Sequence, residues 1–275
     1  MHFLRLFRMT RMCGRAEPRG VFSPSSASSP RTSRSRTTAV AASGRYDRRV
    51  GFEGLDRDAV SFYAELRADN TKTWWTVNRA RYDTAVRGPF EALGAELEPE
   101  FGALKIFRPY RDVRFSADKT PYKLHIGMVS QATPAHYLQL SEEGLMLGGG
   151  IYDVPPAALA RFREAVDDPR TAEDLDALLE ELRSAGFELR REDALKTAPR
   201  GYRADHPRLQ LLQLKRLAVG RREPPADWMW TPDAYDIIAD DWRTVSTWCT
   251  WLTETVGAEL LEAAQSSRRG RGDRT

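Results

Sequence analysis

Residues 105–128 read KIFRPYRDVRFSADKTPYKLHIGM, and the prediction for the rest of the chain works outward from this stretch. It mixes short apolar runs with three arginines, three lysines and two aspartates. Apolar and polar residues alternate on both sides of residues 116–121, which predicts two extended segments joined by a turn. Pro109 has no N–H group to donate to a neighbouring strand, so we expect the first segment at a sheet edge or at a bend.

The charged side chains of this stretch predict a site for an anion. Successive side chains of an extended segment point to opposite faces, so Arg108 and Arg114 are expected to project together with Asp112 between them. Arginine offers a planar fork of donors that suits phosphate and carboxylate groups. The candidate ligand-binding residues are Arg108, Arg111, Asp112, Arg114, Asp118, Lys119, Tyr122, Lys123 and His125. The sequence assigns no catalytic role to any of them, and it leaves open whether the protein is an enzyme.

Two other interpretations of the same charges stay open. In the first, the arginines are neutralised by Asp112 and Asp118, or by acidic residues elsewhere such as Glu142 or Asp153, and the network only fixes packing. In the second, the protein is an interaction module that contacts a nucleic-acid backbone or another protein, with exposed aromatic rings stacking on bases. We favour a small anionic ligand over nucleic acid.

Before this stretch the sequence predicts two helical segments. Asp56 or a neighbour is a candidate cap for a helix that ends near residue 68. A longer helix is expected from about residue 74 to residue 97, with a kink near Arg87 caused by Pro89. Asn70 lies between the two segments, where it can act as a cap or reach the charged residues. Asn78 and Arg79 are expected as a polar pair on the face of the second helix, from which they too can reach the charged residues.

After this stretch the pattern continues with strands and then helices. The further strands are expected at 136–141, 145–153, 187–189 and 217–221. The further helices are expected at 156–167, with a cap near Asp153, and at 171–185, 205–215 and 232–256. Hairpin strands flanked by helices predict the α+β class, with a central antiparallel sheet, helices packed on it, and long helices at both ends of the domain.

Composition divides the chain of 275 residues into three parts. Residues 1–48 hold ten arginines against two carboxylates and are rich in serine and proline, which predicts a disordered basic extension. This composition also resembles that of an organelle transit peptide. Residues 49–258 are expected to form a single domain, and 259–275 a helix end with a disordered basic tail. Because the ends carry the basic charge, residues 49–265 have a net charge of −8, so the overall charge of +3 does not indicate a nucleic-acid binder.

The remaining residue types exclude several classes of site. Cys13 and Cys249 are far apart, so a disulfide is not expected and a reducing, cytoplasmic location fits. The histidines lack metal-ligand spacing, so no metal site is predicted, and no cofactor is identified. The glycines at 148–150 are not followed by a nucleotide-binding motif, and they predict a bulge or a close backbone approach. Arginines interrupt the apolar residues of the first twelve positions, so no membrane partner is expected.

The long motif of the central stretch carries a resemblance to a known family. It runs from Arg108 through Arg111-Asp112, Arg114-Phe115-Ser116 and Asp118-Lys119 to Pro121-Tyr122-Lys123. With supporting matches around residues 70–82, 148–152 and 199–215, the chain resembles the family catalogued as domain of unknown function 2461. The resemblance spans about residues 51–256. It implies a single domain and a set of marked positions, with no agreed activity.

Overall fold

The computed structural model describes residues 51–114 and 117–261, and the predicted α+β class is confirmed. A six-stranded, fully antiparallel sheet has the order β1-β2-β3-β4-β6-β5. Its strands are β1 (Leu104–Ile106), β2 (His125–Ser130), β3 (Ala135–Ser141), β4 (Gly144–Ile151), β5 (Glu188–Leu189) and β6 (Leu217–Glu223). The predicted extension 1–48 lies outside the described residues, as does the predicted tail beyond residue 261.

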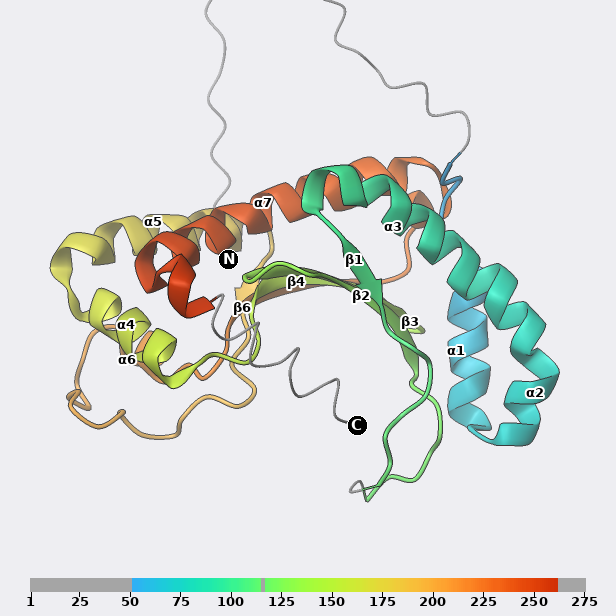
Figure 1. Cartoon of the computed structure of the whole chain (residues 1–275), viewed down its shortest axis with the longest axis horizontal. Helices are drawn as coiled ribbons and strands as arrows, with labels where there is room; N and C mark the ends of the chain where they lie inside the picture. Colours follow the sequence, from blue (N-terminus) through green and yellow to red (C-terminus); the bar gives the residue numbers. More distant parts are fainter. Residues whose placement is uncertain (1–50, 115–116, 262–275) are drawn as a thin grey trace, which may run out of the picture. The chain divides into compact units, whose positions relative to one another are not determined.

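Helices precede and follow the sheet in the chain. They are α1 (Asp58–Ala68), α2 (Lys72–Arg81), the π-helix η1 (Tyr82–Arg87), α3 (Gly88–Phe101), α4 (Pro156–Asp167), α5 (Pro169–Ser184), α6 (Leu209–Leu212), the 3₁₀ helix η2 (Asp227–Trp230) and α7 (Asp233–Val256). Figure 1 shows α3 and α7 crossing one face of the sheet, while α1 and α2 stand beside the end of β3. None of the helices described is long and apolar enough to cross a membrane.

The helical segment after residue 71 changes its winding where the sequence predicts a kink. Thr71 caps α2 by accepting a hydrogen bond from the backbone N–H of Trp74 at 3.2 Å. The chain then passes through η1 and enters α3 at Gly88. Pro89 follows η1 directly in the first turn of α3, and it has no N–H to donate to the preceding helical turn. The change of winding therefore falls just before the proline.

The helix α7 and the strand β6 pack closely against the glycine run of β4. A methyl group placed on Gly148 would lie 2.2 Å from the carbonyl oxygen of Val219, and one on Gly149 would lie 2.6 Å from the side chain of Val245. The close approach expected of these glycines is confirmed. The indole of Trp242 also donates to the carbonyl oxygen of Tyr137 at 3.3 Å, which ties the middle of α7 to β3.

Three local predictions are wrong. Residues 111–114 do not form a strand, and the strand expected from Tyr122 to Ser130 begins only at His125, as β2. Asp153 does not cap α4, whose N-cap position is Pro155. The helix predicted at 205–215 is reduced to α6, because the ring of His206 accepts the N–H of Arg208 at 3.0 Å and holds that residue in a turn.

Candidate functional site: the cationic hairpin

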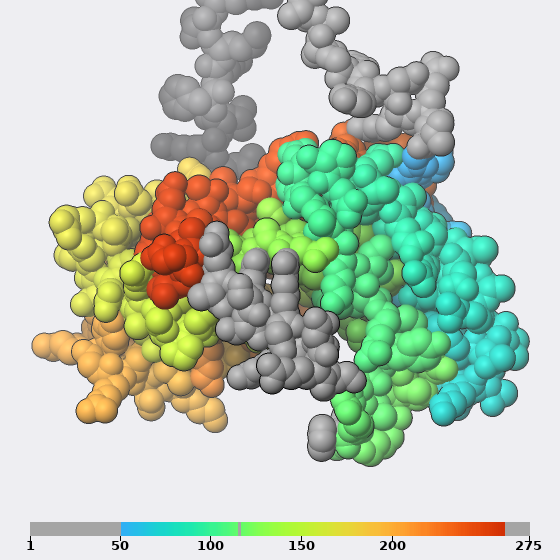
Figure 2. Space-filling model, in the orientation of Figure 1, coloured from blue at the N-terminus to red at the C-terminus, as the bar shows by residue number. Residues whose placement is uncertain are grey.

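Residues 107–124 connect β1 to β2, and we call them the cationic hairpin. Its two arms are joined by backbone hydrogen bonds from Arg111 N–H to the Pro121 oxygen and from Lys123 N–H to the Pro109 oxygen, each 2.8 Å. Pro109 can accept in this position although it cannot donate, which explains why the regular ladder stops before it. Figure 1 shows the hairpin extending away from the sheet beside the helix pair α1 and α2, and Figure 2 shows it as a protrusion of the surface.

The base of the hairpin is fixed to the helices α1 and α2. The ring of Tyr122 is buried and stacks on Trp75, with ring centroids 4.2 Å apart and planes 10° from parallel. Asn70, in the turn between the two helices, donates to the carbonyl oxygen of Tyr122 at 3.0 Å and accepts from its N–H at 3.1 Å. The side chain of Asn70 thus occupies the place that a neighbouring strand would take. The prediction that Asn70 can reach the charged segment is confirmed.

Two arginines of the hairpin form ion pairs within it. Arg111 pairs with Asp118 and also donates to the hydroxyl oxygen of Thr120 at 2.5 Å. Arg114 forms a two-pronged pair with Asp112, with donor–acceptor distances of 2.8 and 3.0 Å. The hydrogen bond from Arg111 lowers the pKa of Asp118 to about 2, and that from Arg114 lowers the pKa of Asp112 to about 2. Both carboxylates therefore remain charged at neutral pH.

The other three cations of the hairpin have no carboxylate partner among the described residues. Arg108 is exposed, and its charge contributes to lowering the pKa of Asp112. Lys119 donates to the backbone oxygen of Val113 at 3.0 Å, and Lys123 lies 5.2 Å from the ring centroid of Phe107. Burial, and then the charge of Arg108, lower the pKa of Lys123.

The hairpin thus carries three more positive than negative side chains among its described residues. His125, the first residue of β2, adds no charge at neutral pH. Burial, and then the charge of Lys123, lower the pKa of its ring, so it remains neutral there. Local positive charge in a domain whose sequence is otherwise acidic favours the approach of an anion.

The structure brings the candidate residues together but gives them different exposure. Arg108, Asp112, Arg114, Asp118 and Lys119 are exposed. The side chain of Tyr122 is packed against Trp75 and supports the hairpin from inside. Glu142, considered above as an internal partner, instead pairs with Arg67 at 2.7 Å.

Two further residues outside the list of candidates join this surface. Tyr110 is exposed on the hairpin, and the alternation that groups it with Arg108 and Arg114 was the signal for it. Arg79 of α2 was expected on a helix face from which it can reach the charged residues. Its pKa is raised by Asp83 first, and the nearby hydroxyl of Tyr110 contributes to the same shift. The contact between α2 and the hairpin therefore widens the candidate surface.

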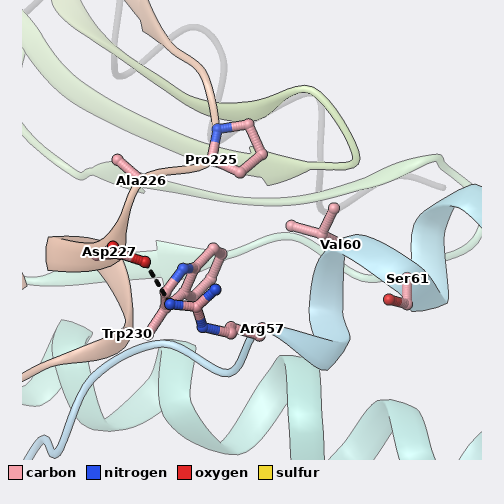
Figure 3. Close-up of a pocket in the computed structure, with 7 residues that line it drawn as sticks. All are labelled: Arg57, Val60, Ser61, Pro225, Ala226, Asp227 and Trp230. Atoms are coloured by element: carbon pink, nitrogen blue, oxygen red, sulfur yellow. Dashed lines mark hydrogen bonds and ion pairs between the residues drawn. The ribbon is translucent and has the colours of Figure 1, made fainter.

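A shallow hollow of about 320 Å³ lies elsewhere, between α1 and η2 (Figure 3). Its lining residues are Arg57, Val60, Ser61, Pro225, Ala226, Asp227 and Trp230. The guanidinium of Arg57 lies 5.7 Å from the ring centroid of Trp230 and pairs with Asp227. The cation of this hollow is thus already neutralised, and the lining includes no residue of the cationic hairpin.

Other chemistry-bearing groups lie in the core. Cys249 is buried, and burial raises the pKa of its thiol to about 12, so it is protonated at neutral pH. His136 is buried in β3, where its ring lies 2.9 Å from the hydroxyl oxygen of Ser246. Within residues 51–114 and 117–261, no group of three His, Cys, Asp or Glu side chains could hold a metal ion.

Residues 58–251 match the model of a protein family described as a conserved hypothetical protein, DUF2461. The chain belongs to this family. The match includes the whole cationic hairpin, Asn70 and Trp75, and it confirms the resemblance drawn from the hairpin motif. Neither a curated protein nor a solved structure matches the chain.

Proposed function

We propose that the protein binds a small ligand bearing a phosphate or carboxylate group, and that the cationic hairpin is its binding surface. The observation that supports this best is the surplus of cations: Arg108, Lys119 and Lys123 have no carboxylate partner in the part of the chain that the structure describes. Arginine supplies a fork of donors for an anion and lysine supplies a compact charge.

The arrangement of the ion pairs supports binding over a purely structural network. A network that fixes packing joins distant segments, as Arg243 does with Glu100 across 143 positions at 2.5 Å. Both pairs of the hairpin instead join residues two or seven positions apart, inside the hairpin itself. They shape its tip and orient two guanidinium groups, while the hairpin is attached to the domain through Asn70 and Trp75.

Thermal unfolding in the presence of anions tests the proposal. Inorganic phosphate, sugar phosphates and dicarboxylates are compared at fixed ionic strength. A ligand at one hundred times its dissociation constant stabilises the folded state by about 2.7 kcal/mol. For a domain of this size that corresponds to a rise in melting temperature of roughly 5–10 °C. Raising the salt concentration should reduce the effect, because exposed charges are screened.

Two variants make the test specific. The double variant Arg108→Gln, Lys119→Gln should abolish the stabilisation and change the melting temperature of the free protein little, because both side chains are exposed and the hydrogen bond from Lys119 to the Val113 oxygen is open to solvent. Arg200→Gln is the matched control, since Arg200 is an exposed arginine outside the hairpin without a carboxylate partner among the described residues. The proposal is refuted if anions stabilise the double variant as much as the wild type, or if no anion stabilises the wild type.

A further inference from the structure

Tyr110 presents an aromatic ring to solvent in the middle of the cationic hairpin. It is 45% exposed, one of three large apolar side chains exposed among the described residues. Its ring rests on one side against Tyr122, at a centroid distance of 5.5 Å, and against Trp75 at 6.3 Å. Its backbone forms the bridge to Tyr122 across the hairpin. The ring is therefore held in place from behind while part of its surface remains available.

Cations lie around this ring. Arg108 is two residues before Tyr110 and is exposed like it. Arg111 follows Tyr110 directly and is oriented by Asp118 and Thr120. Arg79 of α2 pairs with Asp83 at 2.8 Å and lies 6.0 Å from the ring centroid of Trp75, the ring that Tyr110 contacts. An exposed ring bordered by guanidinium groups is the combination that binds a base and its phosphate at once, because the ring stacks on the base and the cations contact the phosphate.

We propose that the ligand of the cationic hairpin carries a planar ring next to its anionic group, in the manner of a nucleoside phosphate, and that Tyr110 stacks on that ring. This inference rests on the proposed function and narrows its ligand class. A free nucleotide and a single-stranded nucleic acid both offer this chemistry, and the net charge of −8 over residues 49–265 favours the free nucleotide.

The first experiment compares ligands that share a phosphate but differ in the ring. Isothermal titration measures the dissociation constants of AMP and ribose 5-phosphate for the wild-type protein and for Tyr110→Ala and Tyr110→Phe. Stacking on one base predicts that AMP binds about 5-fold or more tightly than ribose 5-phosphate. This preference should disappear in Tyr110→Ala and persist in Tyr110→Phe. Tyr152→Ala, which removes another exposed tyrosine, should keep it, and unchanged melting temperatures would show that the variants are folded.

The outcomes separate this inference from the proposed function. Equal binding of the two ligands, or a preference for AMP that Tyr110→Ala retains, overturns the stacking inference and leaves anion binding in place. If neither ligand binds, and inorganic phosphate and the dicarboxylates do not bind either, the proposed function fails as well.

A second titration, with an oligothymidylate of ten nucleotides and with TMP, distinguishes the two sources of the ligand. Similar affinity per site supports the free nucleotide. Much tighter binding of the strand, with a steep dependence on salt, overturns the choice of a free nucleotide in favour of a nucleic-acid strand.

Discussion

Replacing Asn70 by alanine should loosen the cationic hairpin, because two hydrogen bonds to the backbone of Tyr122 are lost together. Each such bond stabilises a protein by about 0.5–1.5 kcal/mol. The expected loss in the free energy of unfolding is therefore about 1–3 kcal/mol, equivalent to a fall in melting temperature of roughly 4–8 °C at the centre of that range. Urea unfolding followed by tryptophan fluorescence measures the free energy, and amide hydrogen exchange at Tyr122 shows whether the change is local.

Two further variants show whether the loss of stability comes from the two hydrogen bonds to Tyr122 or from substitution in general. Asn70→Asp keeps an acceptor for the N–H of Tyr122 but places an oxygen against its carbonyl group, so it should destabilise at least as much as alanine. Asn78→Ala is the control, because Asn78 donates only to the Trp74 carbonyl oxygen within its own helix, at 2.9 Å, and alanine favours the helix. The reasoning is refuted if the free energy of unfolding of Asn70→Ala differs from that of the wild type by less than about 0.3 kcal/mol, or if Asn70→Asp is as stable as the wild type.

Three other predictions concern the core. Burial raises the pKa of Asp241 to about 6 despite its arginine partner. Between the pKa of the unfolded chain and this value, the folded protein keeps the proton that the unfolded chain has lost, so the free energy of unfolding falls as the pH rises through this range. Between pH 4 and pH 7 the free energy of unfolding of the wild type should fall by up to about 3 kcal/mol relative to that of Asp241→Asn. Urea unfolding of both proteins across this pH range measures the difference, and a constant difference would contradict the prediction. Gly148→Ala should destabilise the protein strongly, because the new methyl group would lie 2.2 Å from a carbonyl oxygen of β6. Gly94→Ala is the comparison: its methyl group would have its nearest contact at 3.6 Å, so it should leave the stability unchanged or raise it by up to about 1 kcal/mol. Thermal unfolding measures both changes. In a Cys13→Ser background, Cys249 should react with a thiol reagent only after unfolding, and rapid labelling of the native protein would show that the thiol is accessible.

The sequence indicated the parts of this protein that depend on local periodicity and on proline and glycine. The helix ending at Ala68, the change of winding before Pro89 and the hairpin of β3 and β4 follow from patterns within a few residues. The prediction that the strands continue into residues 111–114 and 122–124 failed for a physical reason. Alternation of polar and apolar side chains also describes a hairpin that is held by a few bonds and by aromatic packing, without a continuous ladder.

The charge of the candidate site was also readable from the sequence, because it depends only on which residues the motif contains. Which of its cations carry spare charge was decided by the tertiary structure. Asp118 could have paired with any of three arginines, and its pairing with Arg111 depends on how the two arms of the hairpin lie against each other. The placement of Asn70 and Trp75 beneath Tyr122 depends on the packing of α2 against the hairpin, across a sequence separation that no local pattern records. The residue types of the motif thus determined the sign of the charge on the hairpin. Contacts made in the folded protein determined which cations lack a carboxylate partner and how the hairpin is attached to the domain.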